Sequence, residues 1–271
     1  MRIGWLATGR DQAASTLLAE VVGRARRDEI ALDIACVFCD RLRGESPESD
    51  RFLGLAEQLH IPAVMASSRE SWAAAQAEGV ARARWREAFH TEVLRLLEPF
   101  GLDVFVMAGY MLIVSPAMCR RYALLNLHPA LPGGPTGTWQ DVIWQLLEEG
   151  AGETGAMIHL ATAELDSGPV VALCRFSLKG PEWEPLWAQF REKRRTLSVA
   201  EIAAAEGEGE PLFAEIRRRG EAREIPLLYQ TIRRFADGKL STADGGVFSE
   251  SVRLPLDLTE SVEQELAAEA V

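Results

Sequence analysis

The sequence predicts an α/β protein built on an open, mostly parallel, doubly wound (Rossmann-like) sheet, with an extra helical segment toward the C-terminus. Two observations lead to this fold class. Short apolar runs alternate with longer helical patterns through the first two-thirds of the chain, which is typical of βαβ units. One of these runs, DVFVM at Asp103–Met107, is apolar at every position after its first. Such runs are typical of strands that are buried on both faces of a parallel sheet.

The strand-like runs are short and bounded by turn residues, whereas the helical patterns are longer. The expected strands are Ile3–Ala7, Leu32–Phe38, Pro62–Met65, Asp103–Met107, Ala123–Leu127, Ala156–Ala161 and Pro169–Phe176. The expected helices are Ala13–Arg27, Ser49–Leu59 and a long helical region over Glu70–Leu97 that breaks near Gly79. Glycine is a poor helix former, and for that reason we place the break there.

The composition shifts at Pro181 toward Glu, Arg and Trp. This predicts surface helices with a flexible break at the polar run Glu206–Glu210. Trp183 and Trp187, four residues apart, are expected on one apolar helix face. The tail from Ser241 carries an Asp-Gly-Gly turn and ends in an acidic helical stretch. We therefore expect three consecutive segments: a first domain over 1–178, a helical insertion and closing helix over 179–240, and an acidic tail over 241–271.

Composition limits the classes of partner. The chain has 271 residues, of which 48% are hydrophobic and 25% charged, so it can bury a core without disulfides or metal. Its net charge of -11 argues against a nucleic-acid surface. No segment reaches the length of a membrane span, and Met1–Ala7 leads directly into a strand-like run without a secretion signal. We expect a cytoplasmic protein with no nucleic-acid or membrane partner; a homodimer remains open.

The cysteine pattern does not favour a metal or redox site. Cys36 and Cys39 form a CxxC, but they lie in or directly after an apolar strand-like run. Residues three apart on a strand point to opposite faces, which disfavours a shared metal ion or an easy disulfide. No second pair with ligand spacing follows, so we expect buried structural thiols and no metal.

Asn126 and His128 lie at the carboxyl end of the strand-like run Ala123–Leu127, where ligands of open α/β sheets collect. Residues two apart on a strand share a face, so both side chains are expected to point into one crevice. Asp166 lies in a turn from which a carboxylate can reach an imidazole. An amide and an imidazolium can both donate to a developing oxyanion, and a carboxylate orients and charges the imidazole. Without a Ser or Cys nucleophile, this set suits direct acyl transfer to an amine, although Asn-x-His alone is also compatible with a packing histidine.

Three segments carry a family resemblance: AGYMLIVSP at 108–116, LLNLHPAL at 124–131 and ELDSGPVV at 164–171. They resemble the signature of the glycinamide ribonucleotide formyltransferase family. The resemblance is specific in this block and extends more loosely over 1–178. It implies the formyltransferase fold and 10-formyltetrahydrofolate as co-substrate, with no metal. It also implies Asn126, His128 and Asp166 as catalytic residues, with His128 as proton donor and Asp166 holding it protonated.

The resemblance implies a co-substrate site made of an arginine, a main-chain segment and a second loop. By position these residues are Arg86, Met111, Leu112, Ile113, Val114, Asn126, Thr162, Ala163, Glu164, Leu165 and Asp166. Arg69, in Ser-Arg-Glu, is the competing arginine but matches at a different spacing. Leu112 stands where an arginine is common in the family. If Arg86 is the ligand-binding arginine, residues 67–84 are an insertion.

The expected acceptor site departs from the family pattern. The family's phosphate loop has closely spaced glycines, whereas here only Gly9 remains, and Ala14, Ser15 and Thr16 stand at the Gly-Ser-Asn positions. Ser15 and Thr16 could still cap a helix and donate to an anion. The resemblance makes Glu221 a candidate for holding the substrate amine or ribose. Trp139, where the family has a histidine, is expected either to stack on a ligand or to pack in the core.

The implied reaction is formyl transfer to a primary amine, with glycinamide ribonucleotide of purine biosynthesis as the first acceptor. The altered loop leaves open another small amine, such as an amino-sugar nucleotide. A formyltetrahydrofolate hydrolase shares the three residues but adds an N-terminal regulatory domain, whereas this chain begins at the first strand. Methionyl-tRNA formyltransferase adds a basic C-terminal domain, whereas the tail here is acidic. The alternative from a different class is a non-catalytic folate-binding protein.

Overall fold

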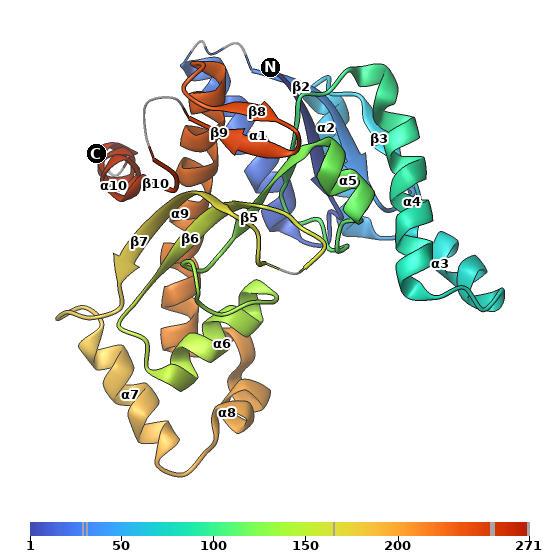
Figure 1. Ribbon diagram of the computed structural model, residues 1–271. Helices are drawn as coiled ribbons and strands as arrows, with labels where there is room; N and C mark the ends of the chain where they lie inside the picture. Colours follow the sequence, from blue (N-terminus) through green and yellow to red (C-terminus); the bar gives the residue numbers. More distant parts are fainter. Residues whose placement is uncertain (29, 31, 165, 250–252, 270–271) are drawn as a thin grey trace. The chain divides into compact units, whose positions relative to one another are not determined.

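The computed structural model describes residues 1–28, 30, 32–164, 166–249 and 253–269 (Figure 1). Contacts divide the chain into two compact units, which are described separately below. The first unit comprises Met1–Leu127, His159–Pro169 and Thr231–Leu254. The second unit comprises His128–Ile158, Val170–Gln230 and Pro255–Val271. The units are interleaved along the chain and so follow a different division from the segments 1–178, 179–240 and 241–271, which stay a prediction.

The first unit is built on five strands in the order β5-β4-β1-β2-β3. Their bounds are β1 Arg2–Ala7, β2 Asp33–Cys39, β3 Ala63–Met65, β4 Val104–Met107 and β5 Ala123–His128, of which the last residue belongs to the second unit. Each neighbouring pair is parallel. The chain runs outward from β1 to β2 and β3, then returns to form β4 and β5 on the other side. The predicted parallel, doubly wound architecture is confirmed.

Helices connect these strands in the expected order. They are α1 Gln12–Arg27, α2 Pro47–Gln58, α3 Ser68–Ala77, α4 Arg82–Leu97, the short 3-10 helix η1 Glu98–Phe100, and α5 Pro116–Arg121. The predicted break near Gly79 is confirmed, because this glycine adopts φ +72° between α3 and α4. A hairpin of β8 Ser241–Ala243 and β9 Gly246–Phe248 completes the unit, with the expected Asp-Gly-Gly turn between them.

The core of the first unit lies between one face of the sheet and the helices α4 and α5. Leu6, Phe38 and Phe105 come from β1, β2 and β4 and are fully buried in one cluster with Phe89 of α4. Burial of one such side chain contributes roughly 1.5–3 kcal/mol. Gly4 makes this packing possible, since a Cβ there would lie 2.6 Å from the Phe105 ring. This core fixes the carboxyl ends of the strands, where the site residues lie.

The second unit contains strands in the order β10-β7-β6. Their bounds are β6 Glu153–Leu160, β7 Val170–Ser177 and β10 Leu256–Asp257. The helices are α6 Trp139–Glu149, α7 Glu184–Arg194, α8 Val199–Glu206, the short 3-10 helix η2 Gly207–Gly209, α9 Pro211–Ala236 and α10 Thr259–Glu269. The last residues of β6 and α9 belong to the first unit. Part of the expected acidic tail therefore forms a strand parallel to β7.

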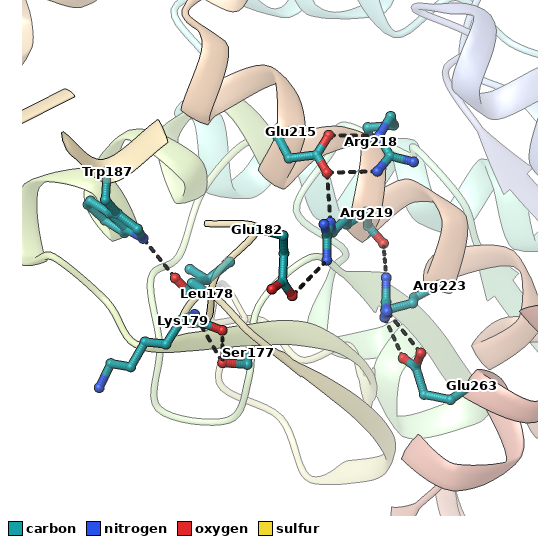
Figure 2. Close-up of polar contacts among 10 residues, drawn as sticks. All are labelled: Ser177, Leu178, Lys179, Glu182, Trp187, Glu215, Arg218, Arg219, Arg223 and Glu263. Carbon is teal, nitrogen blue, oxygen red and sulfur yellow. Dashed lines mark hydrogen bonds and ion pairs between the residues drawn. The ribbon is translucent and has the colours of Figure 1, made fainter. Parts of the chain in front are cut away.

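An aromatic core holds the helices of the second unit. Trp183 and Trp187 are nearly fully buried with Phe190 and Phe213, as the predicted apolar face requires. The indole N–H of Trp187 donates to the Leu178 carbonyl at 2.8 Å, so this buried donor is satisfied (Figure 2).

Arginines of α9 join three other elements of the second unit. Arg219 pairs with Glu182 at 3.7 Å and Glu215 at 2.7 Å, and Arg223 pairs with Glu263 of α10 at 2.7 Å (Figure 2). The guanidinium carbon of Arg223 also lies 4.5 Å above the ring centroid of Phe176 in β7. Such stacked, ion-paired arginines fasten α10 to α9 and β7. None of the described helices is both long and apolar enough to cross a lipid bilayer.

The predicted break between helices falls at Glu206–Glu210, between α8 and α9, and its flexibility stays a prediction. This run forms the end of α8, the single turn η2 and the cap of α9. Glu210 is fully buried, accepts a hydrogen bond from the Phe213 N–H at 2.8 Å, and pairs with Lys193 at 3.1 Å. The polar composition suggested solvent exposure, but a carboxylate at a helix N-terminus with a cation beside it is stable when buried.

Candidate functional site

Two predicted site residues, Asn126 and Asp166, lie beside a histidine that was not predicted, His159, in the first unit. The side-chain amide nitrogen of Asn126, on β5, lies 2.9 Å from Nε2 of His159, near the end of β6. The same Nε2 lies 3.6 Å from Oδ1 of Asp166. The side chains of His159 and Asp166 are only 1% and 6% exposed. The Ala161 N–H donates to the Leu124 carbonyl at 2.8 Å, which joins the two segments and brings these groups together.

The hydrogen bonds of His159 limit its protonation states. Its Nδ1 lies 3.1 Å from the Leu160 carbonyl oxygen, which can only accept, so Nδ1 carries a proton. In the neutral imidazole, Nε2 therefore accepts from the Asn126 amide. In the imidazolium, Nε2 carries an N–H that faces Asp166. The Asn126 amide is then turned over, so that its oxygen and not its nitrogen lies beside this N–H. In both states His159 links the amide of Asn126 to the carboxylate of Asp166.

His159 was missed by the sequence analysis. The signal that could have identified it is a second histidine in the apolar run GAMIHL, close to the end of a predicted strand and seven residues before Asp166. Nothing local in the sequence indicates a partner for this histidine. The pairing of β5 with the segment after β6 supplies that partner.

The turn that carries Asp166 is tightly constrained. Asp166 has φ +49°, a left-handed conformation that costs most side chains energy but is more accessible to aspartate. A Cβ at Gly168 would collide with the Leu160 carbonyl oxygen, and the Leu160 N–H donates to the Pro169 carbonyl at 2.9 Å. The turn is therefore held directly against the end of β6.

The rest of the expected second folate loop is locally hydrogen-bonded. The Thr162 hydroxyl donates to the Glu164 carbonyl at 2.8 Å and also contacts the Ser167 hydroxyl. Ala163 and Glu164 are exposed, and the predicted contact at Leu165 lies outside the described residues.

The expected co-substrate segment 111–114 begins where β1 and β4 diverge, which is the topological switch point of this sheet. Thr8 donates its N–H to the Gly109 carbonyl and accepts at its hydroxyl from the Met111 N–H, both at 3.0 Å. Met111 is 44% exposed, whereas Val114 is buried. Within the described part of the chain, the main-chain groups of 112–114 make no hydrogen bond.

The two competing arginines lie on different helices of the first unit. Arg86 is half-buried on α4, and Arg69 is exposed on α3. The Arg86 carbonyl oxygen lies 3.0 Å from Nδ1 of His90, whose Nε2 lies 3.1 Å from the hydroxyl of Tyr110. Arg86 is thus joined through side chains to the residue preceding Met111.

The prediction that Ser15 and Thr16 cap a helix is wrong. Helix α1 begins at Gln12 with Asp11 at the N-cap position, so both residues lie inside the helix. Ala14 and Ser15 are buried, and Thr16 is half-buried. The helix extends further toward its N-terminus than the position of the capping residue types suggested, because Gln12 and Ala13 both tolerate helical geometry.

The second unit contains His128 and a pocket. His128 is 3% exposed, and its Nε2 lies 2.9 Å from the Pro135 carbonyl oxygen, so Nε2 carries a proton. The pocket is shallow and partly open to solvent, and its cavity volume of about 10 Å³ has room for about one water molecule. Its lining comprises Pro129, Trp139, Ile143, Leu146, Thr154, Gly155, Phe176, Ile216, Arg217, Gly220 and Glu224. One of its lining residues, Pro129, therefore directly follows His128 in the sequence.

One arginine organises the charges of this pocket. Arg217 lies 4.4 Å above the Trp139 ring and pairs with Glu224 at 2.9 Å and Glu221 at 3.4 Å. The side chain of Glu224 is 8% exposed, whereas that of Glu221 is 43% exposed. The predicted residue Glu221 thus contacts the pocket through Arg217, and Glu224 lines it directly. Trp139 packs at a tilt of 48° against a core ring, Phe213, and also lines the pocket.

The thiols of Cys36 and Cys39 are buried on β2. Burial raises the pKa of both thiols to about 12, so neither is a thiolate near neutral pH. Among the described residues, no three His, Cys, Asp or Glu side chains are grouped so that they could hold a metal ion.

Comparison with known proteins places this geometry in a family. The profile of the formyl transferase family matches residues 1–179. Phosphoribosylglycinamide formyltransferase of Escherichia coli K12 is 31% identical over 176 residues, covering 63% of this chain and 66% of that enzyme. The enzyme of the same name from Mycobacterium tuberculosis H37Rv is 33% identical over 122 residues, covering 44% and 56%. The matched region thus spans less than two thirds of the length of each of these relatives.

Solved structures share the fold. Glycinamide ribonucleotide transformylase 1 from Symbiobacterium toebii superimposes with a TM-score of 0.61 at 23% identity, covering 92% of this chain and 93% of that one. A formyltetrahydrofolate deformylase from Pseudomonas syringae pv. tomato gives a TM-score of 0.59 at 21% identity, covering 92% and 65%. The family profile covers more than half of the residues and includes both the Asn126–His159–Asp166 cluster and His128. The chain belongs to the formyl transferase family.

Proposed function

We propose that this protein transfers a formyl group from 10-formyltetrahydrofolate to a primary amine, with glycinamide ribonucleotide as the first acceptor to test. The observation that carries the proposal is the buried cluster of Asn126, His159 and Asp166. It combines a neutral hydrogen-bond donor, an imidazole and a carboxylate in one water-poor place. Such preorganised groups stabilise charge that develops during acyl transfer more strongly than water does.

The proposed reaction is direct attack of the neutral amine on the formyl carbon. The carbon–nitrogen bond to the acceptor forms while the bond to the folate nitrogen breaks. Asn126 and protonated His128 would donate hydrogen bonds to the formyl oxygen as negative charge develops on it, and Asp166 would keep His128 charged. Protonated His128 would give its proton to the folate nitrogen as the bond from that nitrogen to the formyl carbon breaks. The amine proton would leave through water to Asp166, or to His128 once His128 has given up its own proton.

His159 enters the proposal as a positioning residue. Its contact with Asn126 fixes the side-chain amide, and its proximity to Asp166 places the carboxylate on the same face of the cluster. Loss of such orientation by about 1 Å can cost on the order of a hundredfold in rate. The imidazole would thus act through the two groups that it holds.

The folate would bind along residues 111–114 and at Arg86. The free main-chain groups of 112–114 suit a planar ring with several donors and acceptors, and Met111 offers an exposed apolar side chain beside them. Arg86 offers a cation for a carboxylate of the co-substrate. Arg69 remains the alternative; Arg86 is favoured because its main-chain carbonyl contacts His90, whose side chain reaches Tyr110 beside this segment.

The acceptor would bind in the pocket beside Pro129. A primary amine and its neighbouring hydroxyls can donate to the Glu224 carboxylate, and Arg217 balances the charge. The names of the E. coli and S. toebii relatives refer to glycinamide ribonucleotide, which makes it the first acceptor. The altered loop before α1 keeps an amino-sugar nucleotide as an alternative. The deformylase among the structural relatives supports a second function, in which water replaces the amine.

The test is the rate of tetrahydrofolate release from 10-formyltetrahydrofolate with glycinamide ribonucleotide, an amino-sugar nucleotide, or water alone. Release that depends on an amine supports transfer, release without one supports hydrolysis, and folate binding without release supports the non-catalytic alternative. Asn126→Ala, His128→Ala and Asp166→Asn are expected to abolish most turnover. His60→Asn changes an exposed histidine and is the matched control. Full activity in His128→Ala or Asp166→Asn would contradict the mechanism.

A further inference from the structure

Two buried polar side chains of the first unit, His90 and Tyr110, contact each other but take no part in the proposed chemistry. His90 is fully buried on α4, and Tyr110 is 7% exposed in the segment that follows β4. Nε2 of His90 lies 3.1 Å from the Tyr110 hydroxyl oxygen. Their ring centroids are 6.1 Å apart and the planes meet at 63°, so the rings also pack edge to face.

The direction of this hydrogen bond follows from the other ring nitrogen. Nδ1 of His90 lies 3.0 Å from the Arg86 carbonyl oxygen, which can only accept, so Nδ1 carries the proton. Burial lowers the pKa of His90 to about 4, so the imidazole is neutral near pH 7 and its Nε2 is an acceptor. The Tyr110 hydroxyl therefore donates to Nε2. The result is a series of two hydrogen bonds: Tyr110 donates to His90, and His90 donates to the main-chain carbonyl of Arg86.

One end of this series of hydrogen bonds is a residue of the proposed folate site, and the other end is next to such a residue. Tyr110 is adjacent to Met111, the first residue of the co-substrate segment, and Arg86 is its proposed cation. Gly109 and Met111 are tied to Thr8 by hydrogen bonds of 3.0 Å, so the main chain on either side of Tyr110 is fixed to β1. The His90 contact adds a third attachment, which comes from α4. It sets where the segment lies relative to the helix that carries Arg86.

We propose that the His90–Tyr110 pair is a positioning device that holds the folate-binding segment 111–114 in register with Arg86. This inference rests on the proposed function, because it assigns the pair to the folate site of that reaction. Without the hydroxyl, segment 111–114 also populates conformations that do not bind folate. The apparent affinity for folate then falls in proportion to the fraction of molecules in the binding conformation. Loss of one such hydrogen bond changes that balance by about five- to tenfold.

The test compares Tyr110→Phe, which removes only the hydroxyl, with Tyr122→Phe as matched control. Tyr122 lies in the same unit and packs edge-on against Phe105. Two quantities are measured: the KM for 10-formyltetrahydrofolate and the Kd of the unreactive isomer 5-formyltetrahydrofolate. Tyr110→Phe is expected to raise both about five- to tenfold and to leave kcat within about twofold, since the reacting groups are untouched. Tyr122→Phe is expected to leave all three unchanged.

A second variant separates positioning from a general loss of structure. His90→Phe keeps ring volume but removes the acceptor, and the double variant with Tyr110→Phe is expected to bind folate no more weakly than the worse single variant. If the losses of folate affinity add in the double variant, or if the Kd is unchanged in Tyr110→Phe, this inference is overturned while the proposed function stands. Failure of the unaltered protein to bind 5-formyltetrahydrofolate and to turn over 10-formyltetrahydrofolate would overturn the proposed function and this inference with it.

Discussion

The imidazole Nε2 of His159 lies 2.9 Å from the side-chain amide nitrogen of Asn126, although 33 residues separate the two in sequence. In each protonation state of His159 the contact gives the amide a defined orientation, because Nδ1 of the same ring is occupied by the Leu160 carbonyl. An amide that is already oriented can stabilise a developing negative charge without reorganising during the reaction. His159 is therefore the residue on which the geometry of the cluster depends most directly.

Replacement of His159 tests this dependence. His159→Ala is expected to lower kcat by about 10–100-fold and to change the KM for 10-formyltetrahydrofolate by less than about threefold, because Asn126 and Asp166 lose their orientation while the folate segment is untouched. His159→Gln places an amide near the position of Nε2 and is expected to recover part of kcat. Steady-state kinetics measure both. An unchanged kcat in His159→Ala would show that the contact is only structural.

His90 makes folding pH-dependent. Its pKa of about 4 lies below the ordinary histidine value, so the unfolded chain binds a proton between about pH 6.5 and 4 that the folded chain does not. Stability from this group is present above pH 6.5 and is lost as the pH falls, by about 2 kcal/mol at pH 5. Urea unfolding at pH 7 and pH 5 measures the loss. His90→Phe should lose less stability over this interval, and an equal loss in both proteins would contradict the assignment.

The Arg217–Glu224 pair in the second unit should contribute more to stability than exposed pairs do. Their side chains are 15% and 8% exposed, so removal of the cation leaves a buried carboxylate without that counter-charge. Arg217→Met is expected to lower the free energy of unfolding by about 2–4 kcal/mol, and a second change, Glu224→Gln, should recover part of it. Arg195→Met removes the exposed pair with Glu192 and should cost about 0–1 kcal/mol. Denaturant unfolding distinguishes the two, and equal losses would argue against the burial effect.

Glu210 offers a test of the connection between α8 and α9. Glu210→Ala removes the acceptor for the Phe213 N–H and the partner of Lys193, and is expected to lower the free energy of unfolding by about 1–3 kcal/mol. Glu208→Ala, in the same turn but exposed, is the control and should cost less than about 0.5 kcal/mol. If the two variants have the same free energy of unfolding, the buried Glu210 carboxylate does not stabilise the connection between α8 and α9.

The order of strands and helices could be predicted from the sequence because it depends on local patterns. The apolar run at β4, the break at Gly79 and the tryptophans at the start of α7 and one turn into it are features of neighbouring residues. The structure has each where the pattern indicates it. Most element ends agree to within a residue or two, as at α1, which is expected to begin at Ala13 and begins at Gln12. Helix ends depend on which residue caps the helix, and several adjacent residue types can do so.

The sequence by itself determined the fold class and identified Asn126, His128 and Asp166 as candidates, because strand-end polar residues and short motifs can be recognised from adjacent positions. Only the tertiary structure decided that His159 contacts Asn126, that Glu224 rather than Glu221 lines the pocket, and that Glu210 is buried. The physical reason is common to all three. Each depends on strand pairing or helix packing between segments that are distant in sequence, and the energy of a buried polar group is set by the partner that such packing brings to it.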